Sequence, residues 1–401
     1  MRIAITGASG FVGRAIVAEL TKLDVAAEML LIGRDRARLE TAFPGRQICT
    51  YDELEDKAVG FDILLHLPTL NNNVEEAFET FYAVNVQLAL DTACRAKAAG
   101  IPLFIYASSI HALDEQRTDH YSESKRVAAK ELGRLTGIRV VTIYLGAVHA
   151  NRWSGKLSIL NGLPEFLSGR LFKMLAALRP TTSVRRIVQE IRAMAGGSVS
   201  RVLIVTDGQE GNHWYKIVSR TIDVLGALAV AIGLWWLFIV LWFAIKLESP
   251  GPGIFAQERV GRYGRTFTCY KFRTMHVGTV QAATNLVPAN AVTAIGRVLR
   301  ITKLDELPQV WNILKNEMSF IGPRPCLPAQ HELVRAREIL GVLEIKPGIS
   351  GLAQVHGVDM SNPQRLAELD ARYLALRSLS LDFKIILATL KGSGRGDNTA
   401  A

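Results

Sequence analysis

The first half of the chain alternates short apolar runs with stretches whose apolar residues recur at helical spacing. The apolar runs are RIAITGAS, EMLLIGRD, DILLHLP, PLFIYASS, RVVTIYLG and RVLIVTD, and the helical stretches include FVGRAIVAELTKL and ALDTACRAKAAG. Buried strands that alternate with crossover helices are typical of a parallel sheet covered on both faces. Residues 1–208 are therefore predicted to form a doubly wound, Rossmann-like α/β domain.

A different pattern follows the short polar linker GQEGNHW. Residues 224–245 are 22 uncharged, overwhelmingly apolar positions between Asp223 and Lys246. A run of this length can cross a bilayer and its tryptophans suit a membrane interface, so a membrane helix is favoured over a buried core helix. We predict a linker and membrane helix at 209–248, a smaller mixed α/β domain at 249–392 and a disordered tail at 393–401.

Length and charge extend this picture. The 401 residues are too many for one ordinary core, and the net charge of +10 is uneven. From residue 212 onward, 22 Lys and Arg side chains stand against 14 Asp and Glu side chains. Such a basic half suits a membrane surface or phosphates. Nucleic acid is not expected as a partner, because the sequence contains no nucleic-acid-binding motif.

The cysteines and the first residues bear on the compartment. Four well-separated cysteines without a Cys-x-x-Cys pair favour a reducing compartment over a disulfide framework or a metal site. The sequence enters a strand at Arg2, so no signal peptide is expected. Both ends of the chain are predicted to be cytosolic.

A glycine-rich turn follows the first predicted strand. In TGASGFVG, the glycines Gly7, Gly10 and Gly13 surround Phe11 and Val12 at the mouth of a predicted helix. Glycines at this place allow a tight turn and a close approach of backbone N–H groups to a pyrophosphate. This turn is the predicted binding site of NAD(P). The next strand ends in Arg34-Asp35. The arginine favours the 2′-phosphate of NADP, whereas the acid is also compatible with NAD.

Tyr121 and Lys125 are four residues apart in a helical pattern, so they share one helix face. The ammonium group is expected to lower the pKa of the phenol, which then exchanges a proton with a substrate oxygen. Ser109, at the end of a strand, is placed to hydrogen-bond the same oxygen. Asn85 is a further candidate for cofactor binding.

These residues together resemble the extended short-chain dehydrogenases/reductases, the group of NAD(P)-dependent nucleotide-sugar epimerases, dehydratases and reductases. The resemblance covers about residues 1–208 and implies redox chemistry at a carbinol or ketone of a nucleotide sugar. The chain departs from the family at Pro68, where alanine is usual, and in the short loop between Ser109 and Tyr121. It also lacks the acidic pair of a 4,6-dehydratase, which leaves a 4-keto reductase or an epimerase.

The second half combines cations with an acidic pair. Lys271 and Arg273 lie in YKFRTM, Asp305 and Glu306 follow in LDELPQ, and Arg324 stands between prolines in IGPRP. An arginine held by flanking prolines is preorganised to bind a phosphate. A carboxylate beside phosphates needs a bridging cation, for which Mg²⁺ is the natural choice. The acidic pair is then a nucleophile rather than a surface ion pair.

Five stretches of the second half occur in an order that is typical of one enzyme family. They are the membrane segment, FAQERVGRYGRTF, YKFRTM, LDELPQVWNILKNEMSFIGPRP and KPGISGLAQVHG. In this order they resemble the bacterial sugar transferase family, the monotopic phosphoglycosyl transferases, over about 216–392. The resemblance implies transfer of a sugar 1-phosphate from a UDP-sugar to undecaprenyl phosphate, starting a membrane-linked glycan. Asp305 is then the nucleophile and a Mg²⁺ ligand, and Glu306 assists it. The resemblance implies phosphate contacts for Arg300 and Arg324, and Lys271 and Arg273 are further candidates for phosphate or substrate binding because they belong to the basic surface beside the membrane segment.

The membrane hairpin of that family is kinked by a Ser-Pro pair. Here the corresponding place reads Leu234-Trp235-Trp236, without proline, and Gly233 is the flexible point. An unbroken helix would span the bilayer and separate the two domains, although both need cytosolic substrates. We therefore favour a re-entrant helix in the bacterial inner membrane, with both domains on the cytoplasmic face.

The leading hypothesis is a bifunctional enzyme. Its first half completes a UDP-sugar, for instance by 4-keto reduction of a UDP-N-acetylhexosamine derivative, and its second half loads the sugar phosphate onto the lipid. The alternatives are a transferase with a non-catalytic nucleotide-binding domain and a scaffold for glycan assembly. A homodimer is compatible with the sequence.

Overall fold

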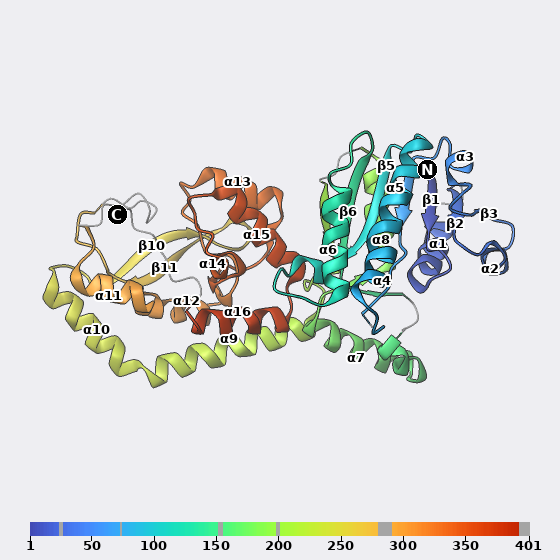
Figure 1. Ribbon diagram of the computed structural model, residues 1–401. Coiled ribbons are helices and arrows are strands. Elements are labelled where there is room, and N and C mark those ends of the chain that lie inside the picture. Colours follow the sequence, from blue (N-terminus) through green and yellow to red (C-terminus); the bar gives the residue numbers. More distant parts are fainter. Residues whose placement is uncertain (24–26, 73, 151–154, 198–200, 280–290, 393–401) are drawn as a thin grey trace. The chain divides into compact units, whose positions relative to one another are not determined.

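The computed structural model describes residues 1–23, 27–72, 74–150, 155–197, 201–279 and 291–392 (Figure 1). The predicted tail at 393–401 lies outside the described residues. The chain divides into two compact units, Met1–Phe172 with Pro180–Asp207 and Lys173–Arg179 with Gly208–Ala401. Each unit is described by itself.

A seven-stranded parallel sheet forms the centre of the first unit, in the order β3-β2-β1-β4-β5-β6-β9. This order, with helices on both faces, confirms the predicted doubly wound fold. The short edge strand β3 was not among the predicted strands. The strands are β1 (Arg2–Thr6), β2 (Glu28–Ile32), β3 (Gln47–Cys49), β4 (Ile63–His66), β5 (Leu103–Ser109), β6 (Arg139–Leu145) and β9 (Val202–Val205).

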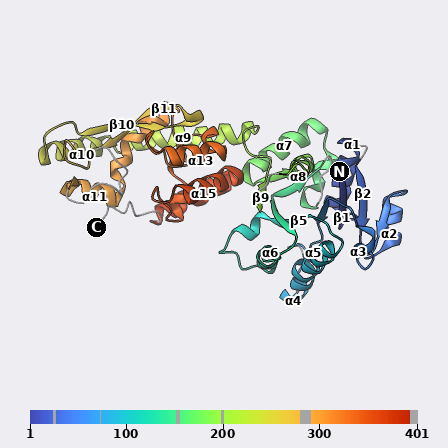
Figure 2. The same cartoon turned by 90° about the horizontal axis from the view of Figure 1, so that it is seen from above.

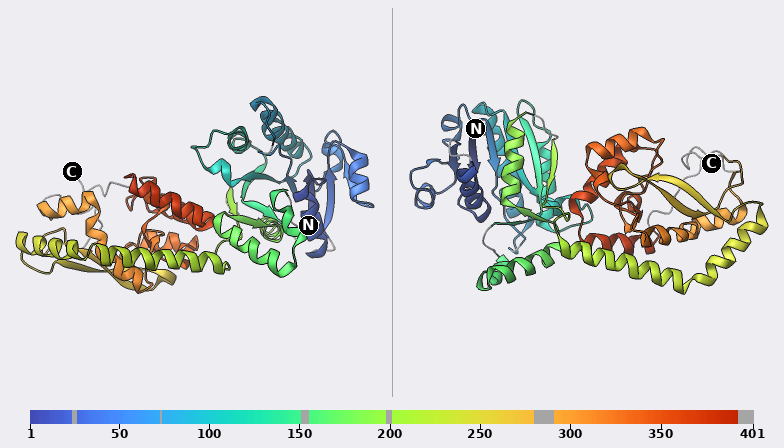
Figure 3. Two further views of the ribbon diagram at one scale, coloured as in Figure 1. Left: turned by 90° about the horizontal axis from the view of Figure 1, so that it is seen from below. Right: turned by 180° about the vertical axis from the view of Figure 1, so that it is seen from behind.

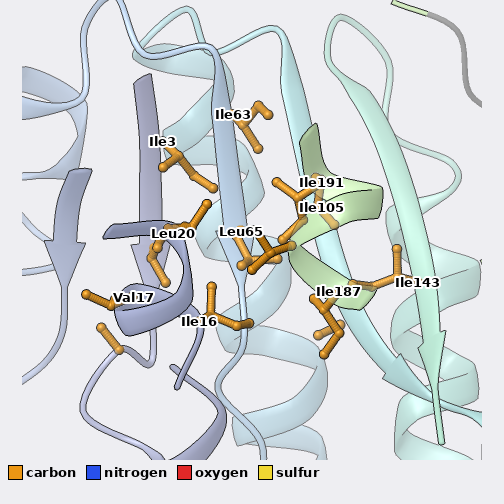
Figure 4. Packing of buried hydrophobic residues seen from close by; sticks show 14 of the residues in the cluster. Ile3, Ile16, Val17, Leu20, Ile63, Leu65, Ile105, Ile143, Ile187 and Ile191 are labelled. Carbon is orange, nitrogen blue, oxygen red and sulfur yellow. The ribbon is translucent and has the colours of Figure 1, made fainter. Parts of the chain in front are cut away.

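Two apolar layers bury the sheet, because side chains alternate between its faces along each strand. On one face, Ile3 and Leu65 pack with Ile16 of α1 (Phe11–Leu23) and Ile187 of α8 (Val184–Ala195) (Figure 4). On the other face, strand residues pack with the alanine-rich α5 (Leu88–Ala98) and with α6 (His120–Leu132).

Smaller elements complete this unit. They are α2 (Arg36–Ala42), α3 (Leu54–Lys57), α4 (Phe78–Tyr82), the π-helical turn η1 (Ala83–Gln87), η2 (Ile110–Leu113), β7 (Ala147–His149) paired with β8 (Thr181–Ser183), and η3 (Gly155–Gly162). The division between the two units falls within helix α7 (Glu165–Leu178), after Phe172. The strand order reverses between β1 and β4, so the carboxyl ends of these strands are where a ligand of this fold is expected.

Two long helices open the second unit, α9 (His213–Gly233) and α10 (Trp235–Glu248) (Figure 3, right). They meet at Leu234 and are bent by 64° relative to each other. No single helix among the described residues has the length and apolarity of a membrane span, whereas this bent pair does when both helices are taken together. The chain therefore breaks directly after Gly233, the flexible point expected from the sequence.

Polar side chains attach the first half of α9 to the rest of its unit. Arg220 donates from its guanidinium to the backbone oxygens of Ile313 (2.7 Å) and Leu314 (3.0 Å). The Asp223 carboxylate accepts from the Ser319 hydroxyl (2.9 Å) and from the backbone N–H of Phe320 (3.0 Å). The later part of α9 and most of α10 expose large apolar side chains, including Ile232, Trp235, Trp236 and Phe243.

The remainder of the unit is a mixed lobe. The antiparallel ribbon β10 (Ile254–Val260)–β11 (Thr266–Phe272) and the parallel pair β12 (Ser319–Ile321)–β13 (Gly348–Ser350) form its sheets. Its helices and 3-10 turns are η4 (Arg262–Gly264), α11 (Ala294–Thr302), η7 (Leu304–Gln309), α12 (Val310–Leu314), α13 (His331–Ile339), η8 (Val342–Glu344), α14 (Leu352–Val355), α15 (Pro363–Leu376) and α16 (Leu379–Leu390). Helices α13 and α15 lie side by side (Figures 1 and 2).

Candidate functional site

The acidic pair lies on the short 3-10 turn η7. Helix α11 ends because Lys303 adopts a left-handed conformation (φ 61°), and η7 begins at the next residue. This reversal turns Asp305 and Glu306 into the lobe, where they are only 9% and 5% exposed. Two adjacent carboxyl groups at this depth are costly unless cations or protons compensate them.

Two cations face Glu306. An Arg324 nitrogen lies 2.9 Å from its carboxylate, and the Lys271 ammonium lies 3.5 Å away. All three side chains line one pocket of the lobe. The other residues that line it are Arg259, Cys269, Gln309, Pro325 and Gly348. The pocket therefore presents cationic groups around a single acid, an arrangement that suits a phosphate-bearing ligand.

Asp305 is adjacent to this pocket on the same turn and is not one of its lining residues. Burial and the neighbouring Glu306 charge raise the pKa of Asp305 to about 6, against the lowering effects of Lys271, Arg324 and Arg300. The carboxyl group is thus destabilised in its ionised form, which raises the basicity of its oxygen.

Glycine contacts join the IGPRP and KPGISG segments. Gly348 donates its N–H to the Pro323 oxygen (2.9 Å), and Gly322 donates to the Ser350 oxygen (2.8 Å). A Cβ on Gly348 would lie 2.1 Å from the Gly322 nitrogen, so only glycine allows this approach. The two segments thereby hold Arg324 toward Glu306.

A buried ion pair, which the sequence did not reveal, contacts the backbone of the IGPRP segment. Arg337 of α13 contacts one carboxylate oxygen of Asp370 on α15 through Nη2 (2.7 Å) and Nε (3.0 Å). Its other terminal nitrogen donates to the backbone oxygen of Arg324 (2.9 Å). The pair is 3% and 2% exposed at its side chains. The only signal in the sequence was that Arg337 and Asp370, 33 residues apart, carry opposite charges in two helical stretches.

The other predicted phosphate ligands lie differently. Arg300 donates to the Thr274 hydroxyl (3.0 Å) and acts electrostatically on Asp305. Arg273 instead donates to the backbone oxygens of Ser249 (2.6 Å) and Pro250 (3.0 Å), and so fastens the end of α10 to the lobe. Its guanidinium is engaged with backbone, apart from the pocket around Glu306.

Metal ligands are limited in this lobe. Within the described ranges, no group of three or more His, Cys, Asp or Glu side chains is arranged to hold a metal ion. Asp305 and Glu306 supply at most a partial ligand set of hard oxygens. This set fits Mg²⁺, which commonly binds one or two carboxylates and takes its remaining ligands from phosphates and water.

In the first unit, the glycine-rich turn lies at the carboxyl end of β1. Gly7 has a positive φ of 73°, and its oxygen accepts from the Gly10 N–H (3.1 Å). A Cβ on Gly13 would lie 2.5 Å from the Gly7 oxygen, so α1 packs directly on the turn. Phe11 is exposed at 39% and Val12 is partly buried. This cradle fits the pyrophosphate of a dinucleotide. Pro68 packs against Gly7 from the neighbouring loop.

Tyr121, Ser109 and Lys125 are all buried or partly buried near the end of β5. Burial raises the pKa of the Tyr121 phenol, and the nearby Ser109 side chain lowers it by a smaller amount. The Lys125 ammonium donates to the Ala107 oxygen (3.0 Å), and burial lowers its pKa to about 7. The expected lowering of the Tyr121 pKa by Lys125 is therefore not found, because burial dominates.

Asn85 lies in the π-helical turn η1, and its amide joins two segments. It donates to the Leu70 oxygen (3.1 Å) and the Ser124 hydroxyl (2.9 Å) and accepts from the Leu70 N–H (2.8 Å). π-Helical turns are frequent at functional sites. Asn85 thus fixes α6, which carries Tyr121, to the loop after β4.

The acidic residue after β2 has a local partner. The Asp35 carboxylate accepts from the backbone N–H of Arg38 (3.0 Å) and caps α2. The Arg34 side chain is exposed at the end of β2. This arrangement leaves the arginine more available to a ligand than the acid.

The fold and both sites define a chain of two parts, a doubly wound sheet with a glycine-rich turn and a lobe in which cations surround a buried acidic pair. Residues 3–215 match the NAD dependent epimerase/dehydratase family, and residues 214–395 match the family described as bacterial sugar transferase. The chain belongs to these two families, one in each half.

Curated relatives match the second half. A "UDP-glucose:undecaprenyl-phosphate glucose-1-phosphate transferase" of Xanthomonas campestris pv. campestris is 35% identical over 48% of this chain and 42% of the relative. A protein of the same name from Caulobacter vibrioides is 36% identical over 45% of this chain and 71% of the relative. A "UDP-N-acetylgalactosamine-undecaprenyl-phosphate N-acetylgalactosaminephosphotransferase" of Aeromonas hydrophila is 40% identical over 44% of each. The chain thus spans about two fifths of the length of the Xanthomonas relative.

A solved structure, the UDP-glucuronic acid 4-epimerase of Bacillus cereus in complex with NAD, aligns with 56% of this chain and 83% of its own. The identity is 15% and the TM-score is 0.42. Similarity at this level carries no information on substrate.

Proposed function

We propose that residues 249–392 transfer a sugar 1-phosphate from a UDP-sugar to undecaprenyl phosphate, through a covalent intermediate on Asp305. The observation that carries the proposal is the buried acidic pair beside a pocket lined by Lys271, Arg259 and Arg324. The family match and the names of the relatives support the donor and acceptor classes. The Aeromonas relative supports an N-acetylhexosamine among the candidate sugars.

In the proposed reaction, an Asp305 oxygen attacks the β-phosphorus of the donor. The bond from this phosphorus to the bridging oxygen breaks, and UMP leaves with the electron pair. A lipid phosphate oxygen then attacks the same phosphorus and releases the Asp305 carboxylate. Arg324 and Lys271 stabilise the phosphate charge, and Glu306 orients them or takes the proton of the lipid phosphate. Arg300 acts on Asp305 at longer range.

Asp305, with Glu306, would hold Mg²⁺ together with substrate oxygens. When bound, the ion supplies charge neutralisation next to the phosphates. The chain's own part is to keep the acidic pair buried and Glu306 paired with cations, so that the site is preorganised before the donor arrives.

Release of UMP tests this assignment. Purified protein is incubated with a panel of UDP-sugars, polyprenyl phosphate and Mg²⁺, and nucleotide release is measured. We expect Asp305→Asn to abolish release and Glu332→Gln, which removes an exposed acid of α13, to retain it. Release at the wild-type rate in Asp305→Asn contradicts the assignment of the nucleophile.

For the first unit we propose 4-keto reduction of the UDP-sugar, with NADP preferred over NAD. The glycine turn, from Gly7 to Gly13, supports binding of a dinucleotide, and the exposed Arg34 supports a 2′-phosphate. The cofactor supplies the hydride. Tyr121, with Ser109 beside it, supplies the proton to the substrate oxygen.

One observation favours a second candidate, a unit that binds nucleotide without turnover. Burial raises the pKa of Tyr121, and the Lys125 ammonium donates to the Ala107 oxygen. NADPH oxidation with a 4-keto UDP-sugar distinguishes the two functions. A reductase consumes NADPH and loses this activity in Tyr121→Phe, whereas a binding unit consumes none in either protein.

We further propose that α9 and α10 enter and leave the same leaflet, so that both units work on the cytoplasmic face of the inner membrane. The 64° bend at Leu234 and the exposed apolar side chains beyond it support this arrangement. Accessibility of single cysteines at both ends of the pair, measured in sealed vesicles, tests it. Labelling from opposite sides of the membrane contradicts the re-entrant arrangement.

A further inference from the structure

Helix α7, Glu165–Leu178, exposes its apolar residues and buries its small ones. Ser168, Ala176 and Ala177 are buried at 7%, 9% and 1% exposure. The exposed large residues are Phe166 (63%), Leu167 (39%), Leu171 (37%), Met174 (44%), Leu175 (38%) and Leu178 (44%). A surface helix of a soluble unit normally has the opposite arrangement.

Five of these residues form one stripe, here called the apolar stripe: Leu167, Leu171, Met174, Leu175 and Leu178. At helical spacing they cover an arc of about 100°. The stripe has no role in the chemistry of either proposed site. An exposed contiguous apolar surface of this kind usually marks an interaction with a partner or a membrane.

Cations flank the apolar stripe. Arg170 lies about 40° beyond one edge of the arc at helical spacing, and Arg179 directly follows Leu178, the last residue of the helix. Lys173 lies on the opposite face of the helix from the apolar stripe. Their side chains are exposed, and within the described part of the chain none of the three is in a salt bridge. Glu165, the acidic residue of the helix, lies farther from the apolar stripe than Arg170 does.

The C-terminal part of α7 is fastened to the start of α9. The Asn212 side chain donates to the Lys173 oxygen (2.9 Å), and the Gln209 side chain donates to the Ala176 oxygen (2.8 Å). Both donors are buried, at 8% and 3% exposure. The part of α7 that contains Met174 and Leu178 therefore belongs to the same compact unit as α9 and α10.

We propose that α7 is an interfacial helix, which lies on an anionic lipid surface with the apolar stripe inserted and Arg170 and Arg179 at the headgroups. An apolar face flanked by cations is the pattern of helices that bind in the plane of a membrane. Basic residues near such a surface are attracted by the negative charge of its headgroups. The inference rests on the proposed placement of α9 and α10 at a membrane.

A second copy of α7 is a weaker occupant of this face. The spacing of Leu167, Leu171, Met174 and Leu178 suits a coiled coil, but the helix of 14 residues holds only two heptads. Coiled coils usually need about three to four heptads. Two facing copies would also bring the flanking cations together without acids to pair them, whereas anionic headgroups neutralise them.

Depth-dependent quenching tests the proposal in the full chain. In a Cys94→Ser background, which removes the exposed cysteine, a fluorophore is attached at Met174→Cys, at Trp236→Cys or at Glu123→Cys. The protein is reconstituted in vesicles of phosphatidylethanolamine and phosphatidylglycerol. We expect nitroxide-labelled acyl chains to quench the labels at 174 and 236 several-fold more than the label at 123. Iodide in water should show the reverse order.

The outcomes separate this inference from the proposed function. A label at 236 that iodide reaches as well as the label at 123 overturns the placement of the bent pair. A protected label at 236 with an exposed label at 174 overturns only the inference on α7. If the label at 174 is shielded from iodide by a second copy of the protein and not by lipid, the inference on α7 is overturned in favour of a dimer.

A charge variant completes the test. Arg170→Gln with Arg179→Gln should reduce lipid quenching of the label at 174 in anionic vesicles. The matched control, Arg185→Gln with Arg192→Gln, removes two exposed cations from α8 and should leave the quenching unchanged. Equal quenching in both double variants, or in vesicles of phosphatidylcholine alone, overturns the anionic preference.

Discussion

The Arg337–Asp370 pair gives a prediction that separates stability from catalysis. Its charged groups lie 2.7 Å apart, at 3% and 2% side-chain exposure. Asp370→Leu leaves the Arg337 charge buried without its partner, a loss that typically costs about 3–5 kcal/mol of unfolding free energy. Replacement of both residues, Arg337→Met with Asp370→Leu, removes both charges and should return the unfolding free energy to near the wild-type value.

The double variant still lacks one contact, because Arg337 no longer donates to the Arg324 oxygen. A hydrogen bond of this kind contributes about 1 kcal/mol, or more when a charged group donates it. Because this contact holds Arg324 at Glu306, we expect UMP release to fall about tenfold without it, since 1.36 kcal/mol corresponds to a factor of ten. The double variant should therefore be stable and slow.

Unfolding by heat, followed through tryptophan fluorescence in detergent, and UMP release on the same samples measure the two effects. Arg365→Gln, which breaks the exposed pair with Glu368 on α15, is the control and should change stability by no more than about 0.5 kcal/mol. The reasoning is refuted if Asp370→Leu is as stable as the wild type. It is equally refuted if the stable double variant releases UMP at the wild-type rate.

Three other results are expected. Burial and Glu306 raise the pKa of Asp305 to about 6, so transfer should fall as the pH drops through about 6; Glu306→Gln should move this acidic limb of the pH–rate profile to lower pH, and an unmoved limb contradicts the coupling. Gly348→Ala brings a Cβ to 2.1 Å from the Gly322 nitrogen and should destabilise the second unit by about 1–3 kcal/mol, whereas Gly211→Ala, with open space around its Cβ, should stay within about 0.5 kcal/mol in the same unfolding assay. Burial lowers the pKa of Lys125 to about 7, so the folded state binds fewer protons than the unfolded state between pH 7 and its ordinary value of 10.5; Lys125→Met should therefore gain stability relative to the wild type at pH 7, and this gain should shrink as the pH rises toward 10, which a series of unfolding midpoints checks.

The sequence was sufficient for those parts of the fold that local patterns specify. Buried strands such as LFIYASS are apolar on both faces and lead into helical periodicity, so the parallel sheet followed from them. The edge strand β3 has only three residues, and its register depends on pairing with β2 rather than on its own pattern. No proline in the sequence predicts the bend after Gly233, although the glycine indicates where the helix breaks.

At the candidate site, the sequence pointed to side chains more easily than to the contacts that hold them. The adjacency of Asp305 and Glu306 and the Pro-Arg-Pro segment were visible directly. The support of Arg324 by Arg337 and Asp370 joins residues from three separate segments, so only the tertiary structure reveals it. The engagement of Arg273 with backbone oxygens and the dominance of burial over Lys125 at Tyr121 likewise depend on packing that no local pattern encodes.

Mass spectrometry of the enzyme stopped during turnover tests the central chemistry most directly. Protein is mixed with a UDP-sugar and Mg²⁺ in the absence of lipid phosphate, quenched in acid and digested. We predict a peptide containing Asp305 that carries the added mass of one glycosyl phosphate, is absent in Asp305→Asn, and disappears when polyprenyl phosphate is added before the quench. UMP formation without any such adduct on that peptide would contradict the proposed nucleophile.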